Sequence, residues 1–387
     1  MQPWFIDFWS LFLWLTNALL RALAYVTYAE SEAFSNGIEA QLPPEGSIAR
    51  GWEPYDYEDS NEGYELAKAQ LISPVHRLLD RILEENKGKK KIGSTLKGIG
   101  PTYQDKIGRH GLRVGDVLSK SFKEKYEKQK SYHDYFLEGH YNDSFKIEEE
   151  DFFLAIGFLK KFNLTDTEYL INNNLKKEKK ILAEGAQGTL LDIDFGSYPF
   201  VTSSNTTTAG ACIGLGISPN KINNVYGIFK AYCTRVGAGP FPTELFDDIG
   251  DRIAQNGKEF GSTTGRPRRC GWLDIPALKY SVMLNGVTHL YMMKADVLSD
   301  FHKVKVCIGY EYEGEEIDYF PSIIDSDNIK PIYKSFSGWT SGVNNSRTYS
   351  DLEENFKNYV KFIEDNIGVK VKLISLGPDR DETVLLD

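Results

Sequence analysis

The hydrophobic positions along most of the chain follow the periods expected of helices and strands. Between Pro74 and the lysine-rich run 87–91, leucine and isoleucine recur at helical spacing, which predicts a helix that begins at this proline. The same spacing predicts two further helices over about 121–138 and 147–162. A late helix is expected to start at Ser350, with the glutamate three residues on completing a capping box.

Short apolar runs of strand length lie between the predicted helices. The pair Glu313-Gly314 is typical of a hairpin turn between two strands. Because strands and helices alternate, we predict an α/β fold with a mainly parallel central sheet flanked by helices. The runs expected to form strands are Ile181–Ala183, Val225–Tyr232, His289–Met293, Lys303–Glu311 and Val369–Ser375.

Residues 1–64 break this pattern. Residues 4–27 are mostly apolar, whereas residues 29–64 are polar and are typical of a linker. The uncharged run Phe8–Leu20 is short for a bilayer span, and no positively charged start of a signal peptide precedes it. A packed segment, a segment that contacts a membrane, and a signal therefore all stay open for residues 4–27. We expect a domain boundary here, with residues 65–387 forming the main domain.

Composition and charge narrow the class of protein. The chain has 387 residues, 26% of them charged, and a formal net charge of −10. These proportions are ordinary for a globular protein, and the acidic balance argues against a protein that binds nucleic acid. The four cysteines are scattered and show neither metal-ligand spacing nor a disulfide framework. We therefore expect a reduced, cytoplasmic setting.

Residues 183–210 form a long stretch rich in glycine and hydroxyl side chains. Such a stretch offers free backbone N–H groups and little side-chain bulk, which suits a polar ligand held close to the backbone. A structureless loop of this length is uncommon in a compact domain unless it has a function. We therefore predict a ligand site here and keep an ordinary surface loop as the alternative.

Two other stretches combine fixed cations with glycines and hydroxyl groups. Lys97–Tyr103 precedes three further basic residues, a set that suits a phosphate ester. Arg235–Glu244 leads to Gly261–Arg269, in which three arginines follow Ser-Thr-Thr-Gly. In an acidic protein such a local concentration of cations favours an anionic ligand. A solvated basic loop is the alternative in both cases.

Lys294 and Asp296 follow directly after the predicted strand His289–Met293. A carboxylate at this position can accept hydrogen bonds from the N1–H and exocyclic amine of guanine, while the lysine stem covers the base. Ser375–Pro378 follows the last predicted strand and would supply a second wall of the base pocket. Lys-x-Asp recurs by chance, so this pattern has weight only together with its neighbours.

Two further patterns are interpreted as structural. The glycines of Gly210–Gly216 have the wrong spacing for a dinucleotide fingerprint, and no acidic residue ends a following strand. The six histidines show no metal-ligand spacing, so each is expected to be an ordinary surface or helix residue.

Taken together, these stretches resemble the adenylosuccinate synthetase family, whose members join IMP and L-aspartate at the expense of GTP in purine biosynthesis. The similarity runs in order from about residue 70 to the C-terminus. It implies a P-loop-NTPase-like ligase fold, Mg²⁺ as cofactor and a homodimer. The segments that match family signatures are Lys97–Tyr103, Gly111–Asp116, Glu184–Asn205, Arg235–Glu244 and Thr263–Arg266.

The resemblance assigns roles to matching positions, with Arg109 expected to reach the IMP phosphate of the partner subunit. Leu96 departs from the family, which usually has glycine beside the IMP-binding threonine. The expected IMP contacts are Thr95, Arg109, Gln187, Thr202 and Arg266. The expected aspartate loop contains Ser262, Thr263, Thr264, Gly265, Arg266 and Arg268. The expected GTP contacts are Arg268, Lys294, Ala295, Asp296, Ser375, Leu376 and Gly377.

The larger departure concerns catalysis. The family opens with a strand and a phosphate loop, Gly-Asp-Glu-Gly-Lys-Gly-Lys, whose aspartate is the base, and a later Asn-Ala-Gly-His supplies an acid. Neither motif occurs here, and Glu84–Lys89 has only a faint likeness that ends a predicted helix. No catalytic residue and no metal ligand can therefore be assigned, and we expect ligase activity to be absent or impaired.

Loss of the first strand also predicts an exposed sheet edge, which residues 4–27 would be able to cover. Two rival interpretations stay open. The chain is either a non-catalytic paralogue that binds IMP and GTP, or the product of a truncated or rearranged gene in which residues 1–64 are foreign to the family.

Overall fold

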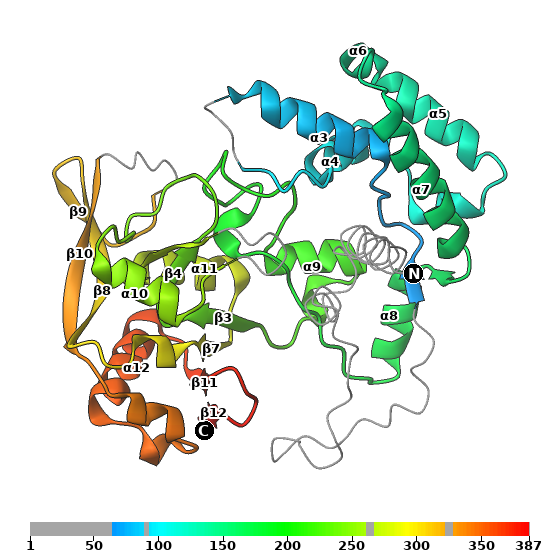
Figure 1. The fold of residues 1–387 in the computed structure, drawn as a ribbon. Coiled ribbons are helices and arrows are strands. Elements are labelled where there is room, and N and C mark those ends of the chain that lie inside the picture. The colour runs from blue at the N-terminus through cyan, green and yellow to red at the C-terminus, as the bar shows by residue number, and fades with distance from the viewer. Residues whose placement is uncertain (1–63, 89–92, 261–266, 322–327, 387) are drawn as a thin grey trace, which may run out of the picture. The chain divides into compact units, whose positions relative to one another are not determined.

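The computed structural model describes residues 64–88, 93–260, 267–321 and 328–386 (Figure 1). They form two compact units. The first contains the described residues up to Gly188 together with Thr202–Pro219, and the second contains Thr189–Val201 and Asn220 onward. The chain therefore passes from the first unit to the second, returns, and crosses again. The predicted boundary at residue 64 stays a prediction, because the preceding residues lie outside the described ranges.

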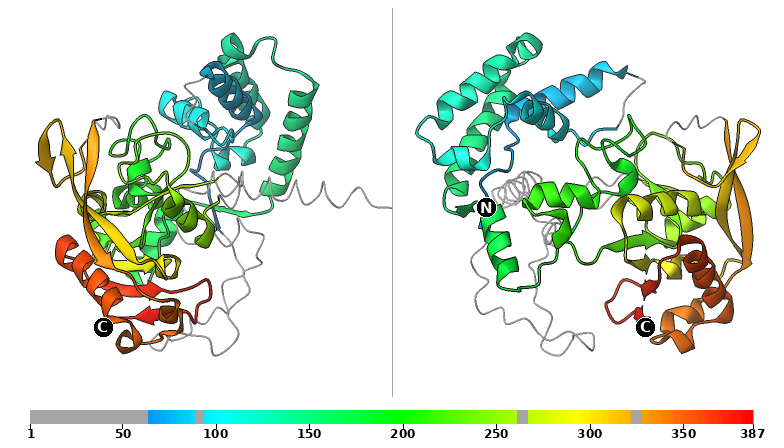
Figure 2. Two further views of the ribbon diagram at one scale, coloured as in Figure 1. Left: turned by 60° about the vertical axis from the view of Figure 1, so that its left-hand side comes forward. Right: turned by 180° about the vertical axis from the view of Figure 1, so that it is seen from behind.

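The first unit is mainly helical, and its helices α3 to α7 group together in Figures 1 and 2. Its two short strands pair in parallel, with Tyr64 opposite Asn163. Leu78, Tyr126 and Phe152 belong to one hydrophobic core that joins α3, α5 and α7. The elements are β1 (Tyr64–Leu66), α3 (Pro74–Asn86), α4 (Ile99–Gly108), α5 (Phe122–Tyr132), α6 (Asp134–Leu137), α7 (Asp143–Leu159), β2 (Asn163–Thr165), α8 (Thr167–Lys176) and α9 (Thr208–Leu215).

Local chemistry explains where these helices begin. Helix α3 starts at Pro74, as predicted, and the Ser73 N–H donates to His76 Nδ1 (3.0 Å). A proline is favourable there because its missing N–H would have no intrahelical acceptor. Helix α7 starts after Asn142, whose side-chain oxygen accepts from the Phe145 N–H (3.0 Å). The glycines of Gly210–Gly216 lie within and at the end of α9, in accord with their structural interpretation.

The second unit contains the mainly parallel sheet, in the strand order β12-β11-β7-β3. Strand β7 pairs in parallel with both β11 and β3, whereas β12 is antiparallel to β11. A second sheet, in the order β10-β8-β6 with β9 beside β8, mixes parallel and antiparallel pairs. Its elements are β3 (Tyr226–Lys230), β4 (Cys233–Arg235), α10 (Asp248–Asn256), β5 (Arg269–Gly271), β6 (Leu273–Asp274), α11 (Ile275–Asn285), β7 (His289–Met293), β8 (Lys303–Tyr312), β9 (Glu315–Ile317), β10 (Ile329–Ser337), α12 (Glu354–Ile367), β11 (Val371–Ser375) and β12 (Thr383–Leu385).

One core holds the second unit together. Met292 of β7, Ile374 of β11 and Phe356 of α12 are all completely buried in it. Full burial of side chains of this size contributes roughly 1.5–3 kcal/mol each to the free energy of unfolding. Trp272 and Trp339 belong to the same cluster. The predicted α/β class, with open sheets flanked by helices, is therefore confirmed.

Three local predictions were wrong. Ile181–Ala183 is irregular and Leu182 is 63% exposed, so this run is not a buried strand; among the described residues it has no partner strand. The stretch 121–138 is divided into α5 and α6 at His133. Helix α12 begins at Glu354, because Ser350 belongs to a preceding 3₁₀ turn that Thr348 and Asp351 cap.

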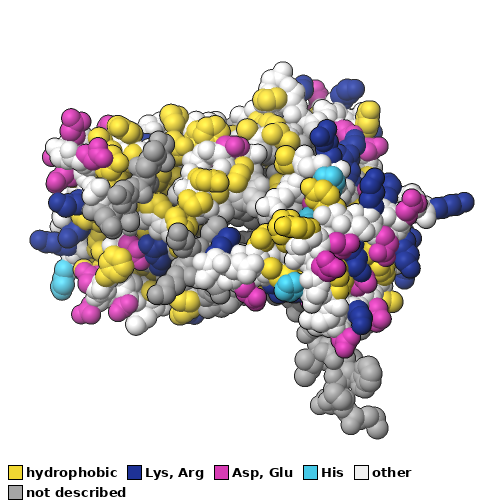
Figure 3. All heavy atoms as spheres, turned by 90° about the horizontal axis from the view of Figure 1, so that it is seen from above, with side chains coloured by type: hydrophobic (Ala, Val, Ile, Leu, Met, Phe, Trp, Pro, Cys, Tyr) yellow, Lys and Arg dark blue, Asp and Glu magenta, His cyan; other side chains and the backbone are white. Residues whose placement is uncertain are grey.

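The surface carries groups of all types. On the face drawn in Figure 3, basic and acidic side chains both occur, with hydrophobic side chains between them. In the central sheet, β3 has β7 on one side and no described strand on the other, and Ile228 of β3 is 71% exposed. No helix in the described part of the chain is both long and apolar enough to cross a membrane.

Candidate functional site

Two of the predicted GTP-binding segments leave neighbouring strands at the same edge of the central sheet. Strands β7 and β11 are parallel, with Met292 opposite Ile374. Lys294 follows the end of β7, and Leu376 follows the end of β11. The crevice beyond the carboxyl ends of parallel strands is the usual ligand site of open α/β sheets. The fold thus brings together residues that lie about eighty positions apart.

Asp296 has an oxygen without a hydrogen-bond partner. Its Oδ1 is buried, and no group of the described residues donates to it. Burial raises the pKa of this carboxyl above its ordinary value, while the backbone N–H groups of Asp296 and Val297 and the charge of Lys294 act in the opposite direction. A buried acceptor without a donor costs about 1–3 kcal/mol, more for a charged group. Such an atom is well suited to a donor from a ligand.

The segment after β11 is tightly built. Leu376 is fully buried, and its N–H donates to the Glu382 carbonyl oxygen (2.8 Å). The Ser375 hydroxyl donates to the Gly377 carbonyl oxygen (3.0 Å). A Cβ at Gly377 would meet the carboxylate end of the Glu382 side chain, which would have to move aside. The backbone near Asp296 therefore has a fixed shape.

Arg268 and Lys294 share one acidic partner, the buried Glu259. Arg268 Nη1 donates to Glu259 Oε2 (2.9 Å), and Lys294 Nζ donates to Glu259 Oε1 (2.9 Å). Both cationic side chains keep partial exposure, 28% and 35%. They are therefore anchored at a buried point and still accessible to an anion.

Two other arginines among the described residues of this region, Arg235 and Arg269, have structural partners. Arg269 forms an ion pair with Glu244 and donates to the Gly239 carbonyl oxygen (2.9 Å). Arg235 donates to Ser197 Oγ and to the Phe200 carbonyl oxygen (3.0 Å each). Burial, and secondarily Arg269, lowers the pKa of Arg235 to about 10. Arg269, one of the three arginines in the predicted cationic cluster, thus makes contacts within the protein that hold this region together.

The expected aspartate loop lies mostly outside the described residues. Ser262, Thr263, Thr264, Gly265 and Arg266 fall in the range 261–266, so the predictions for them stay predictions. At the two ends of this range, Phe260 and Pro267 form an antiparallel bridge, and the Arg268 N–H donates to the Glu259 carbonyl oxygen (2.9 Å).

In the first unit, two acids of α3 organise the segment that contains Thr95. Glu84 Oε1 accepts from the N–H groups of Gly93 (2.7 Å) and Ser94 (3.2 Å). Asp80 accepts from the Ser94 hydroxyl (2.9 Å) and from the Gly98 N–H (2.9 Å). Burial opposes ionisation of Glu84, yet these N–H groups and Lys87 hold its pKa below the ordinary value.

Leu96 adopts a backbone conformation that favours glycine. Its φ is +55°, in the left-handed region, where a side chain with a Cβ is strained. The resemblance to the family predicts glycine at this position. A glycine there would adopt the left-handed conformation without this strain.

The described residues predicted to contact IMP all belong to the first unit. Thr95, Arg109 and Gln187 are exposed, and Thr202 is partly exposed. Their segments approach one another: a Cβ at Gly100 would lie 3.5 Å from Ser203 Oγ, and the Thr206 hydroxyl donates to the Gly188 carbonyl oxygen (2.8 Å). Arg266 is outside the described residues.

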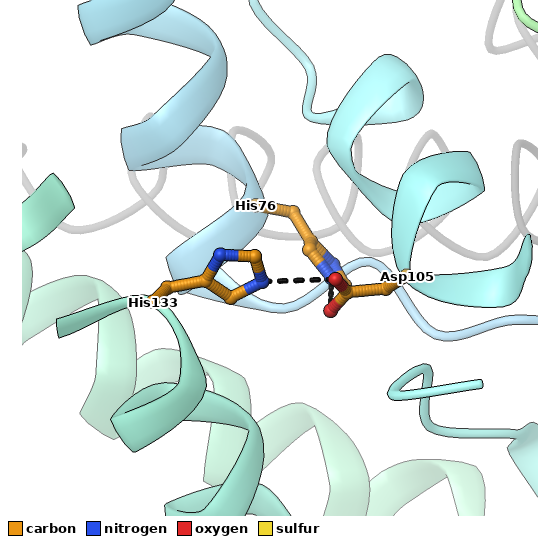
Figure 4. Close-up of side chains that lie close together, drawn as sticks. All are labelled: His76, Asp105 and His133. Atoms are coloured by element: carbon orange, nitrogen blue, oxygen red, sulfur yellow. Dashed lines mark hydrogen bonds and ion pairs between the residues drawn. The ribbon is translucent and has the colours of Figure 1, made fainter. Parts of the chain in front are cut away.

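A buried cluster of His76, Asp105 and His133 was missed from the sequence (Figure 4). The two imidazoles approach the carboxylate from α3 and from the junction of α5 and α6. His76 Nε2 lies 2.9 Å from Asp105 Oδ2, and His133 Nε2 lies 2.9 Å from Asp105 Oδ1. The amide of Gln129 also donates to Asp105 Oδ2 (3.0 Å). His76 lies in α3, as the expectation of surface or helix positions allowed, and His133 lies between α5 and α6; what the sequence did not indicate is that both are buried against one carboxylate.

The hydrogen bonds of His76 argue against a metal ion at this cluster. Its Nδ1 accepts from the Ser73 N–H (3.0 Å), so the ring proton is on Nε2 and is donated to Asp105. Ligation through Nε2 would need the proton on Nδ1, opposite the Ser73 N–H. The two histidines and the carboxylate therefore form a hydrogen-bonded network that ties α4 to α3 and α5.

A cavity of about 380 Å³ also lies in the first unit. Its lining comes from α4, the start of α8 and the end of α9, and includes Tyr103, Lys106, Glu168 and Ile213. Thr102, Tyr103 and Lys106, which belong to the stretch predicted to suit a phosphate ester, line it, whereas none of the residues assigned to IMP, L-aspartate or GTP does. No sequence pattern pointed to the part of the lining that α8 and α9 contribute.

Comparisons with known proteins agree with the geometry. The sequence model of the family described as adenylosuccinate synthetase matches residues 64–384. The chain is 55% identical over 323 residues to the adenylosuccinate synthetase of Cytophaga hutchinsonii, covering 83% of this chain and 75% of that protein. It is 56% identical over 320 residues to that of Flavobacterium johnsoniae, covering 82% and 76%.

A solved structure is similar to most of the chain. It is that of fully ligated adenylosuccinate synthetase from Plasmodium falciparum, with a TM-score of 0.79 and 37% identity, covering 84% of this chain and 78% of the other. The match to the family's sequence model, residues 64–384, spans both units, including the segments that follow β7 and β11. On these grounds the chain belongs to the adenylosuccinate synthetase family.

Proposed function

We propose that this chain binds GTP and IMP at the sites implied by its family, and that its GTP-dependent ligation of IMP and L-aspartate is absent or impaired as the chain is written. The family and its relatives support an adenylosuccinate synthetase function in purine biosynthesis. Binding and turnover are separate questions here, because the residues assigned to binding and those assigned to catalysis lie in different parts of the family sequence.

One observation carries the GTP assignment, namely the buried Asp296 Oδ1 that lacks a donor among the described residues. Guanine presents two adjacent donors, N1–H and the exocyclic amine, which match one carboxylate. Lys294, two positions earlier, would lay its stem along the base, and the Ser375–Gly377 backbone would close the opposite side. Arg268, anchored on Glu259, would face the phosphates.

The IMP assignment rests on the segments around Thr95, Gln187 and Thr202. Asp80 and Glu84 fix the backbone beside Thr95, so its hydroxyl would meet the nucleotide from a preset loop. Arg109 is exposed at the end of α4, where a second subunit would be able to contact it. We propose a homodimer in which Arg109 acts on the IMP of the partner subunit.

The proposed loss of activity rests on the sequence. The 387 residues contain neither Gly-Asp-Glu-Gly-Lys-Gly-Lys nor Asn-Ala-Gly-His. In the described part of the chain, the one group of ligand-type side chains close enough to hold a metal has two histidines, whereas Mg²⁺ prefers oxygen ligands. These residues do not fit Mg²⁺. General acid–base groups contribute about 10²–10⁴-fold, so their absence would leave little turnover.

The second candidate is a broken gene product. Residues 1–63 lie outside the family match, which begins at residue 64. If a rearrangement joined them to the rest, the upstream DNA would encode Gly-Asp-Glu-Gly-Lys-Gly-Lys in another frame. The cytoplasmic setting and any membrane contact of residues 4–27 stay predictions, which fractionation and liposome flotation of the full chain would test.

Calorimetric titration of the full chain with GTP and with IMP tests the binding proposal. In Asp296→Asn, the amide presents a donor and an acceptor in place of two acceptors. Xanthine carries a carbonyl oxygen where guanine carries its exocyclic amine, so the binding preference should move from GTP toward XTP. Adenylosuccinate formation, followed by absorbance, tests the second part. Turnover comparable to that of an intact relative would overturn the loss of activity, and absence of GTP binding would overturn the assignment of the site.

A further inference from the structure

Glu259 holds an unusual number of positive charges for one buried carboxylate. Its side chain is fully buried. Lys230 Nζ lies 2.9 Å from each of its oxygens, and Lys294 Nζ lies 2.9 Å from Oε1. Arg268 Nη1 lies 2.9 Å from Oε2, and the Tyr232 hydroxyl donates to Oε1. Three cations and a hydroxyl therefore converge on a single acid.

A purely structural role does not require this arrangement. One cation with good hydrogen bonds is enough to keep a buried carboxylate ionised, and every further buried charge has a desolvation cost. The three cationic side chains are 23%, 28% and 35% exposed, so each extends from the buried carboxylate toward solvent. Because one carboxylate cannot neutralise three cations, the group presents a positive surface.

The cations come from three separate segments that Glu259 joins. Lys230 ends β3 opposite Met293 of β7, which places it beside Lys294. Lys294 has a left-handed φ of +59° and also donates to the Gly257 carbonyl oxygen (2.6 Å). Arg268 is attached a second time, since its N–H donates to the Glu259 carbonyl oxygen (2.9 Å). The side chains of Arg268 and Lys294 thus share the Glu259 carboxylate as their common anchor, and Lys294 has a second acceptor on Gly257.

We propose that Glu259 is a positioning residue of the guanine-nucleotide site, one that holds Arg268 and Lys294 in their binding geometry before the nucleotide arrives. This inference rests on the proposed function. Long cationic side chains lose much rotamer freedom when a ligand orders them, and a pre-ordered pair avoids that loss. Burial opposes ionisation of Glu259, but Tyr232 and the lysines lower its pKa to about 2, so the anchor stays charged at neutral pH.

Titration of the full chain with GTP and, separately, with IMP distinguishes positioning from a structural role. Glu259→Gln keeps the size and one acceptor but removes the charge. We expect the Kd for GTP to rise at least tenfold and the Kd for IMP to stay within about twofold, because the described IMP residues belong to the first unit. The control is Glu364→Gln, which removes a carboxylate that pairs with Lys370 before the start of β11 and contacts neither Arg268 nor Lys294; both constants should be unchanged.

A double variant sharpens the test. If Glu259 acts through Lys294, then Lys294→Met should weaken GTP binding strongly in the original chain and much less in the Glu259→Gln background. Additive effects would overturn the proposal. Should Glu259→Gln fail to fold, Glu259→Asp serves instead, because it keeps the charge but shortens the side chain by one methylene. We then expect the Kd for GTP to rise severalfold and the Kd for IMP to stay unchanged.

The outcomes separate the two levels of inference. If the original chain binds GTP and Glu259→Gln changes the two constants equally or not at all, the positioning role is wrong and the proposed function is untouched. If the original chain does not bind GTP, the proposed function fails and the positioning role fails with it.

Discussion

Two buried carboxylates, Glu259 in the second unit and Asp105 in the first, satisfy their charge in contrasting ways. Glu259 has three cationic partners that extend outward and a tyrosine. Asp105 has two imidazoles and an amide, all of them buried. The cationic side chains around Glu259 reach the surface, whereas the side chains around Asp105 are buried with it. The carboxylate of Asp105 therefore ties helices together, while we propose that the carboxylate of Glu259 positions cations for a ligand.

Removing the Asp105 carboxylate should give the largest change in stability. In Asp105→Ala, buried donors of His76, His133 and Gln129 lose their acceptor. We expect the first unit to lose about 3–5 kcal/mol, because breaking a buried charged network leaves unpaired groups. Peptide-level hydrogen exchange of α3 to α5 measures this. Asp143→Ala, whose side chain is 94% exposed, is the control and should leave the protection unchanged.

Acid should weaken the two units at different pH values. Burial lowers the pKa of His76 below 6.5, so below that pH the unfolded chain takes up a proton that the folded chain does not. The contribution of His76 to the stability of the first unit is thus fully present above about pH 6.5 and is lost as the pH falls. The pKa of Glu259 falls from 4.5 to about 2, so its contribution is lost only below about pH 4.5.

Hydrogen exchange between pH 7.5 and 5.0, corrected for the intrinsic rates, measures this difference. Because only the pKa of His76 lies below its ordinary value in this range, protection of α3 and α4 should fall as the pH drops through about 6.5, while β7 and β8 are unaffected. His76→Gln, which can still donate to Asp105 but does not titrate, should flatten the response of the first unit. Earlier weakening of the second unit would contradict the comparison.

A smaller effect is expected when one partner of Glu259 is removed. In Tyr232→Phe the carboxylate loses a hydroxyl donor but keeps its three cations, so the free energy of unfolding should fall by about 1 kcal/mol. Denaturant titration measures the change. Tyr319→Phe, at a tyrosine that is 61% exposed, is the control. A loss of stability as large as that expected for Asp105→Ala would mean that the three cations do not keep the Glu259 carboxylate satisfied without the hydroxyl, contrary to our inference.

The smallest effect has the opposite sign. Leu96 has a φ of +55°, so Leu96→Gly should relieve strain and raise stability by up to about 1 kcal/mol, after the entropy that glycine adds to the unfolded chain. Ile107→Gly provides the contrast, because Ile107 is 77% exposed within α4 and glycine in a helix costs about 1 kcal/mol. Equal signs for the two variants would contradict the strain at Leu96.

Sequence patterns predicted what depends on local chemistry. Helix α3 begins at Pro74, β7 covers His289–Met293, and Glu313-Gly314 joins β8 to β9, because caps, alternation and turn residues act over a few positions. The run Ile181–Ala183 failed, because its apolar character does not supply a partner strand. The late helix began four residues after the predicted start, because Thr348 and Asp351 cap a separate turn first.

The candidate functional site also combines residues that local sequence patterns predict with residues that they do not. Lys294 and Asp296 were predicted from their place after a strand, and the assignment of Ser375–Gly377 as their neighbour came from the family resemblance and the strand pattern together. Glu259 and the cluster around Asp105 were not predicted. Their partners are 9 to 35 positions away for Glu259 and 24 to 29 positions away for Asp105, on separate elements, so no spacing rule connects them.

The interleaved path of the chain bears on how this protein is synthesised. The first unit is complete only at Pro219, after Thr189–Val201 of the second unit has already emerged. Leu215 of α9, which is buried in the first core, is therefore added late. A fragment that stops at Gly188 lacks this helix. During synthesis the first unit therefore cannot complete its core until residues 202–219 have emerged from the ribosome. For the same reason, cleavage of the chain at one position cannot release either unit intact.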